Sequence, residues 1–211
     1  ELEQAIRQAT VQQEVEDLYL PYRPKRRTRA TMARERGQAP LADAILAQEP
    51  VEGTLADRAA PYLSDEVPTV DDAYAGARDI VAETIAEDAA VRQAVRSKTL
   101  RAGVLIATVD DKQADPQQKY KDYYDFQERL ATLPAHRLLA LNRGEEEGVL
   151  KVKLDAPQET LVALIKQYYP VKARTLFGSQ MREAQQDAYK RLIGPAIERE
   201  LRSMRTDQAD L

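Results

Sequence analysis

Residues 17–37 read DLYLPYRPKRRTRATMARERG, and our interpretation of the fold starts from this stretch. Pro21 and Pro24 each lack a backbone donor and disfavour helical geometry in the residue before them, which predicts an extended connector around them. Thr28 is a suitable N-cap for a short helix that ends at Gly37. The stretch therefore predicts a bend between two helices.

Positive charge is concentrated in the same stretch. The chain has a formal net charge of −4, yet seven basic residues and one acid lie between positions 23 and 36. Positions 92–101 form a second run of basic residues. Because clustered cations can bind phosphates, the candidate nucleic-acid-binding residues are Arg23, Lys25, Arg26, Arg27, Arg29, Arg92, Arg96, Lys98 and Arg101. The alternative, which we prefer for residues 23–36, is that these side chains bond carbonyls and carboxylates of the chain itself.

The composition favours a mainly α-helical protein. The chain of 211 residues is 43% hydrophobic, 31% charged and 6% aromatic, and helix-forming residues dominate. It contains no cysteine, and its apolar runs are too short to span a bilayer. It begins at Glu1, which we interpret as an excised or processed chain. We expect a cytoplasmic protein without a membrane partner.

Two helices in tandem are predicted over residues 69–87 and 89–102. Thr69 and Asp88 are the expected N-caps, and Gly103 is the expected end of the second helix. Two helices joined by a tight turn, the second of them basic, resemble a helix-turn-helix unit. The alternative is a helical hairpin used only for packing, because Gln93 alone is of a type that could read bases beside the arginines.

One short strand is predicted near the middle of the chain. Leu150, Val152 and Leu154 alternate with two lysines, as in a half-buried strand. A strand needs a hydrogen-bonding partner, so either residues 138–141 pair with it or its partner lies outside this chain. The fold class is therefore mainly α, with one short strand or hairpin near residues 138–154.

A tyrosine-rich segment covers residues 110–126. Its tyrosines and lysines could stack unpaired bases in a charged groove. Because three acids compensate the lysines, we prefer an aromatic face packed on neighbouring elements. Other local signals predict helices over residues 2–19 and 157–169, a cap at Ser179, and a break or kink at Gly194 and Pro195.

The sequence contains no recognisable catalytic motif. There is no glycine-rich phosphate loop, no zinc-binding histidine pair and no nucleophile elbow. His136 is the only histidine, and no cysteine, serine or second histidine lies near it in sequence. We expect no enzyme activity, no catalytic residue, no metal and no cofactor.

Several separated segments resemble the Tex family of bacterial transcription accessory proteins. They are the stretch at 17–37, the end of the basic helix at 98–103, KYKDYYDF at 119–126, HRLLALNRGEEEGVLKVKL at 136–154, and IERELRS at 197–203. The resemblance implies the helical N-terminal portion of a larger protein. A YqgF domain, a helix-hairpin-helix region and an OB-fold RNA-binding domain would follow it.

The resemblance and the residue patterns together predict three consecutive segments. Residues 1–50 form a helical segment with the basic bend, residues 51–109 a helix-turn-helix-like subdomain, and residues 110–211 a helical segment with the short β element. We expect a scaffold that frames the central domains and offers interaction surfaces. The alternative is a module that binds phosphates directly. The expected partners of the whole protein are nucleic acid, RNA before DNA, and the transcription machinery.

Overall fold

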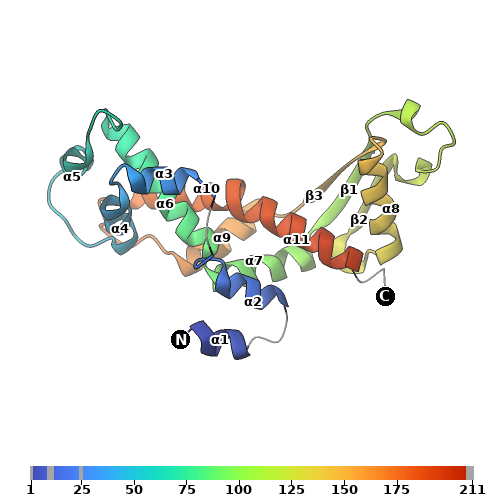
Figure 1. The fold of residues 1–211 in the computed structure, drawn as a ribbon, viewed down its shortest axis with the longest axis horizontal. Helices are drawn as coiled ribbons and strands as arrows, with labels where there is room; N and C mark the ends of the chain where they lie inside the picture. The colour runs from blue at the N-terminus through green and yellow to red at the C-terminus, as the bar shows by residue number, and fades with distance from the viewer. Residues whose placement is uncertain (1, 9–11, 24–25, 208–211) are drawn as a thin grey trace. The chain divides into compact units, whose positions relative to one another are not determined.

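The structure is a computed structural model that describes residues 2–8, 12–23 and 26–207, with side chains as far as residue 203. In chain order its elements are α1 (Leu2–Gln8), α2 (Gln12–Tyr19), α3 (Arg29–Glu35), α4 (Ala39–Ala47), α5 (Leu55–Ala59), η1 (Ala60–Tyr62), α6 (Val70–Glu87), α7 (Ala89–Ala102), β1 (Val104–Val109), η2 (Lys112–Ala114), η3 (Lys121–Tyr123), β2 (Asp125–Arg129), η4 (Leu130–Thr132), α8 (Ala135–Glu146), β3 (Leu150–Asp155), α9 (Gln158–Tyr168), α10 (Gly178–Asp187), the π-helical segment η5 (Ala188–Ile193) and α11 (Gly194–Asp207) (Figure 1). The prediction of a mainly α-helical fold with a short β element is confirmed.

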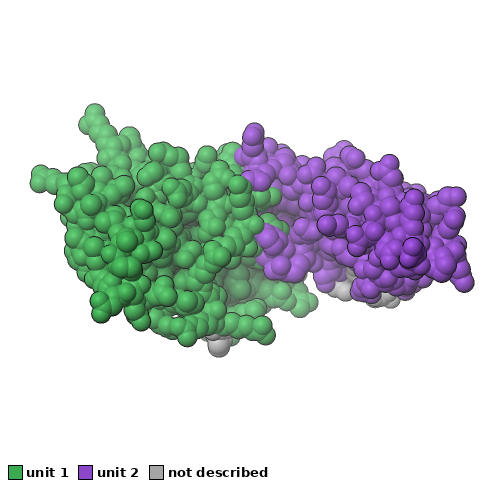
Figure 2. All heavy atoms as spheres, turned by 90° about the horizontal axis from the view of Figure 1, so that it is seen from above, with its two compact units in different colours: residues 1–93, 162–194 green, residues 94–161, 195–211 purple. Residues whose placement is uncertain are grey.

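The chain divides into two compact units (Figure 2). The first contains residues 1–93 and 162–194, and the second contains residues 94–161 and 195–211. Each unit joins two pieces of chain that are far apart in sequence, whereas the segments predicted from the sequence are consecutive. The division after positions 50 and 109 stays a prediction.

The first unit is built around α6. Its N-terminus is capped by Thr69, whose hydroxyl accepts a hydrogen bond from the Asp72 amide over 3.1 Å. The helices α3, α4 and α10 pack against it (Figure 1). Ile80, Val81 and Ile85 of α6 are at most 1% exposed. Burying a side chain of this size stabilises the fold by roughly 1.5–3 kcal/mol. Helix α6 therefore supplies a large part of the apolar core of this unit.

Local capping signals in the sequence predicted several helix ends correctly. The Thr28 hydroxyl accepts a hydrogen bond from the Thr31 amide over 3.1 Å, and α3 ends before Gly37 as expected. Asp88 caps α7 through bonds from the Ala90 and Val91 amides. Pro24 and Lys25 of the predicted connector lie outside the described residues.

Two predicted helices differ in detail from the structure. The single helix predicted over residues 2–19 is described as α1 and α2, and residues 9–11 lie outside the described residues. The predicted cap at Ser179 is wrong, because Phe177 occupies the N-cap position and α10 begins at Gly178.

The helical run near residue 194 continues through a π-helical segment where the sequence predicted a break or kink. The Gly194 amide donates to the Tyr189 carbonyl, five residues earlier. Pro195 has no amide hydrogen to continue the usual pattern, and a π turn absorbs such an interruption. A Cβ atom at position 194 would lie 2.9 Å from the Tyr189 oxygen, so glycine permits this close approach. Helix α11 then follows directly.

The second unit contains an antiparallel sheet of strand order β2-β1-β3. The predicted strand at 150–154 is confirmed as β3, but both expectations for its partner are wrong. Residues 138–141 belong to α8, which packs against β3 (Figure 1). The partner is β1, where Leu105 lies opposite Leu154 and Ala107 lies opposite Val152. β1 reads VLIATV, a short apolar run rich in β-branched residues, which is a strand signal that the prediction overlooked.

The described residues contain no helix that is long and apolar enough to cross a membrane.

Candidate nucleic-acid interface

The bend between α2 and α3 exposes both aromatic and basic side chains. We call residues 19–29 the elbow. Tyr19 is 47% exposed and Tyr22 is 66% exposed, which is unusual for side chains of this size. The described candidates from this segment are all exposed, namely Arg23, Arg26, Arg27 and Arg29. Lys25 lies outside the described residues. The elbow therefore offers phosphate-binding and base-stacking groups to solvent.

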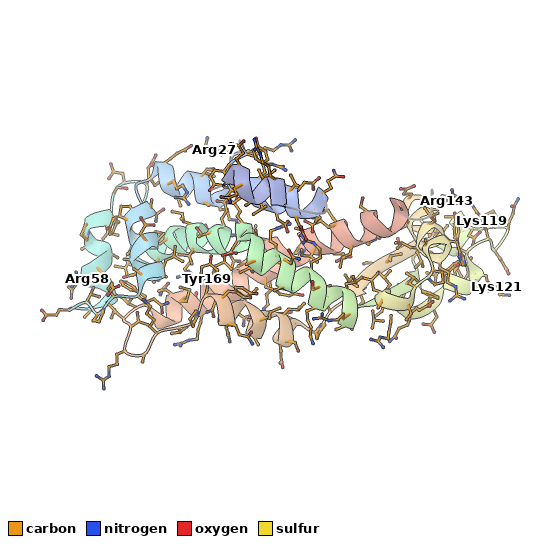
Figure 3. The ribbon with its side chains drawn as sticks, turned by 90° about the horizontal axis from the view of Figure 1, so that it is seen from below. Arg27, Arg58, Lys119, Lys121, Arg143 and Tyr169 are labelled. Atoms are coloured by element: carbon orange, nitrogen blue, oxygen red, sulfur yellow. The ribbon has the colours of Figure 1, made fainter. Side chains whose placement is uncertain are left out.

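Within the elbow, one arginine is paired with an acid. The Arg27 Nη2 atom lies 3.3 Å from Glu35 Oε2, and both side chains are well exposed (Figure 3). An exposed pair of this kind contributes at most about 1 kcal/mol. A phosphate can compete with Glu35 for the guanidinium group at little cost.

Arg92 lies in a buried ion pair in the first unit. Its Nε atom lies 3.2 Å from Asp17 Oδ1, and its Nη1 atom donates to the Ala86 carbonyl. The Arg92 and Asp17 side chains are 8% and 3% exposed. The pair joins α2 to the first turn of α7, so this guanidinium group is directed into the protein.

Arg96 has a comparable place in the second unit. Its Nε and Nη2 atoms lie 3.1 and 3.0 Å from Glu200 Oε2, and both side chains are mostly buried. Lys98 is half-buried and Arg101 is exposed. The basic run at residues 92–101 thus divides in two. Arg92 and Arg96 bind carboxylates inside the protein, whereas Lys98 and Arg101, nearer the end of α7, reach solvent.

A groove that the sequence analysis did not anticipate lies in the first unit, between the start of α3, α6, α10 and η5. It has a volume of about 580 Å³ and is lined by Arg29, Ala75, Arg78, Asp79, Arg182, Glu183, Gln186, Asp187 and Lys190. Residues 182, 186 and 190 recur every four positions, the spacing that places side chains on one helix face. This spacing is visible in the sequence and could have indicated the helix face that lines the groove.

The carboxylates of this groove are bound by neighbouring arginines. Arg78 Nε lies 3.3 Å from Glu183 Oε2. Arg191 Nη2 lies 2.9 Å from Asp187 Oδ2 and 3.5 Å from Asp79 Oδ1. Burial raises the pKa of Asp79, and the Arg191 guanidinium opposes that rise. The acids of the groove are therefore largely neutralised within the protein.

The tyrosine-rich segment of the second unit folds around Asp115. Its carboxylate accepts hydrogen bonds from the Lys119 and Tyr120 amides and from the Tyr124 hydroxyl, each over 2.8 Å. Tyr120 is 2% exposed. Lys119 Nζ lies 4.8 Å from the centre of the Tyr120 ring. These contacts support the packing interpretation, because Tyr120 offers no free face for a base.

Among the described residues, no group of three or more histidine, cysteine, aspartate or glutamate side chains could hold a metal ion. The His136 side chain is exposed on the first turn of α8.

Comparison with known proteins identifies the family. The model of the Tex central region matches residues 52–210. The chain is 45% identical to Protein tex of Bordetella pertussis over 157 residues, 73% of this chain and 20% of that protein. It is 39% identical to Transcriptional accessory protein Tex of Neisseria gonorrhoeae over 161 residues, 76% and 21% of the two chains.

A more distant relative is the S1 RNA-binding domain-containing protein 1 of Pongo abelii. It is 29% identical over 211 residues, 94% of this chain and 21% of that protein. The chain thus spans about a fifth of the length of these three relatives. The match of the family model to most of the chain, together with the agreement of the helices and the sheet with the expected mainly α fold, shows that this chain belongs to the Tex family.

Proposed function

We propose that this chain is a helical scaffold within a Tex-family protein that acts with nucleic acid in transcription. The observation that carries the proposal is the internal use of arginine. Arg92 of α7 binds Asp17 of α2, Arg96 of α7 binds Glu200 of α11, and Arg191 of η5 binds Asp79 of α6, each pair within one compact unit. Such charge-assisted bonds fix helices in one arrangement, as a framework for other domains requires.

The partners of the whole protein follow from the names of its relatives. One relative is called a transcriptional accessory protein, and another contains an S1 RNA-binding domain. We therefore propose nucleic acid as the partner, RNA before DNA, with the transcription machinery as a second partner in the cytoplasm. We also propose that this chain has no catalytic activity, since its sequence holds no catalytic motif.

The scaffold proposal can be tested in a full-length Tex-family protein that contains this chain. We expect Arg92→Ala to destabilise the first unit and to reduce activity in a transcription assay. We expect Arg23→Gln with Arg26→Gln, which changes exposed charges only, to leave the fold and transcription unchanged. If the elbow substitutions abolish RNA binding while circular dichroism shows an intact fold, a scaffold role alone does not explain the function of this chain.

A second candidate function is direct binding of a nucleic-acid strand by the elbow. It is favoured by the exposure of Tyr19 and Tyr22 beside four exposed arginines. Stacking on an aromatic side chain contributes about 1–3 kcal/mol per base. Four phosphate contacts predict a salt slope of about −3 for a single strand.

Fluorescence anisotropy with a labelled 20-nucleotide RNA tests this second candidate. Titrations of the 211-residue chain at two salt concentrations give the slope. Tyr22→Ala and the pair Arg26→Ala with Arg27→Ala should each weaken binding, while Lys166→Ala on α9 serves as the control. Equal affinities for all variants would remove the elbow as a binding site.

A further inference from the structure

The groove beside α10 has an excess of positive charge that its own acids do not compensate. Each of its three carboxylates already lies within 3.5 Å of a guanidinium nitrogen of Arg78 or Arg191. Three further cations line the groove and are exposed, namely Arg29, Arg182 and Lys190. Among the described residues, none of these three takes part in an ion pair. The groove can therefore bind an anion from outside the protein.

The three cations come from separate elements that converge on one hollow. Arg29 is the first residue of α3, Arg182 lies in α10, and Lys190 lies in η5. The π turn of η5 alters the direction of its side chains relative to an uninterrupted helix, and π turns are frequent at functional sites. Arg191, in the same turn, forms ion pairs with Asp187 and Asp79.

The positive surface extends beyond the groove in one direction. Arg29 joins the groove to the exposed arginines of the elbow, which precede it in sequence. The excess of positive charge does not extend into a second hollow of about 340 Å³, which shares Arg29 and Asp79 with the first and reaches Arg36, because Glu66 and Asp72 also line it. A charged surface longer than one side chain suits an extended polyanion better than a single small anion.

We propose that this groove binds the phosphodiester backbone of a nucleic-acid strand, with Arg182 and Lys190 each contacting a phosphate and Arg29 directing the strand toward the elbow. The proposal rests on the proposed role with nucleic acid and names the site on the first unit. Arginine suits phosphate because its planar group donates two parallel hydrogen bonds. An acidic protein segment is the competing occupant, and the experiment separates the two.

The test compares two double variants of the 211-residue chain that remove the same charge. The groove variant is Arg182→Gln with Lys190→Gln, and the matched control is Arg143→Gln with Lys166→Gln, whose exposed side chains lie outside the groove. Because all four side chains are exposed, the substitutions should leave the fold intact, which thermal melting by circular dichroism checks. Anisotropy titrations use a labelled 20-nucleotide RNA, the same DNA sequence, and a labelled polyglutamate peptide.

Loss of two phosphate contacts should reduce the magnitude of the salt slope by about 1.4 and weaken RNA binding roughly 25-fold at 0.1 M salt. The control should keep the slope of the parent chain. The comparison of RNA with DNA shows which backbone the groove takes, and preference for either one supports the proposal.

Three results would overturn the proposed groove. The first is an equal salt slope of RNA binding for the groove variant and its control. The second is the absence of any salt-sensitive binding by the parent chain. The third is binding of polyglutamate that depends on the groove, without binding of RNA or DNA. None of these removes the scaffold role, because that role depends on the effect of Arg92→Ala. Failure of the groove and failure of the scaffold are thus distinguished.

Discussion

The Tyr169 hydroxyl donates a hydrogen bond to Asp88 Oδ2 over 2.7 Å, while Asp88 Oδ1 accepts hydrogen bonds from the Ala90 and Val91 amides near the start of α7. One carboxylate thus caps α7 and holds the end of the α9 segment. Gln185 of α10 donates to the Tyr169 carbonyl over 2.6 Å. Three segments of the first unit are joined at this point.

Burial, and secondly the bond to Asp88, raises the pKa of Tyr169 above its ordinary value. Since the folded-state pKa is the higher one, this contribution to stability is complete below the unfolded value of about 10 and is lost as the pH rises toward the folded pKa. We expect the parent chain to lose more stability between pH 8 and pH 10.5 than Tyr169→Phe does. Urea unfolding at the two pH values measures the difference, and equal losses would contradict the assignment.

The stability of the first unit should depend strongly on both residues of the buried ion pair, Arg92 and Asp17. Arg92→Ala leaves an uncompensated buried carboxylate and should reduce the free energy of unfolding by about 3–5 kcal/mol. Replacing both residues, with Arg92→Met and Asp17→Leu, should recover most of that loss. Chemical unfolding followed by circular dichroism measures each variant. A double variant no more stable than Arg92→Ala would show that the loss does not come from the unpaired charge.

Gly76 of α6 faces the side chain of Gln38. A Cβ atom at position 76 would lie 2.1 Å from Gln38 Oε1, and the Gln38 amide nitrogen donates to the Asp72 and Ala73 carbonyls. We expect Gly76→Ala to destabilise the chain by about 1–3 kcal/mol through overpacking. Gln38→Ala removes the obstructing atoms, so a double-mutant cycle should show strong coupling between the two sites. Additive effects would contradict this.

Asp115 should make the tyrosine-rich segment sensitive to acid. Burial opposes its charge, yet hydrogen bonds from the Tyr120 amide, the Tyr124 hydroxyl and the Lys119 amide hold its pKa below the usual value. The stabilisation is present above the unfolded pKa of about 4 and is lost as the pH falls through the folded pKa.

We expect the hydrogen-exchange protection of the Tyr120 amide to fall between pH 6 and pH 3 in the parent chain. Asp115→Asn should lower this protection at pH 6 and remove most of its dependence on pH. The amide of Ile165 in α9, whose side chain is fully buried, is the internal reference. Unchanged protection of Tyr120 in acid would exclude Asp115 as the group that orders the segment.

Features that depend only on neighbouring residues can be predicted from the sequence alone. Thr28 and Thr69 cap the helices predicted to follow them, and the alternation of Leu150, Val152 and Leu154 predicted β3. Caps, turns and periodicity involve residues within a few positions of each other, so a single sequence contains them. The same sequence also carried the resemblance to the Tex family.

Contacts between residues far apart in the chain depend on how the chain folds. In the pairing of β1 with β3, Leu105 lies opposite Leu154, which is 49 positions later in the chain (154 − 105). Arg92 meets Asp17 although the two are 75 positions apart. An arginine on a predicted helix has the same sequence pattern whether it faces solvent, as Arg182 does, or a buried carboxylate. Its role is set by the burial and charge of the partner, which the fold alone brings into contact.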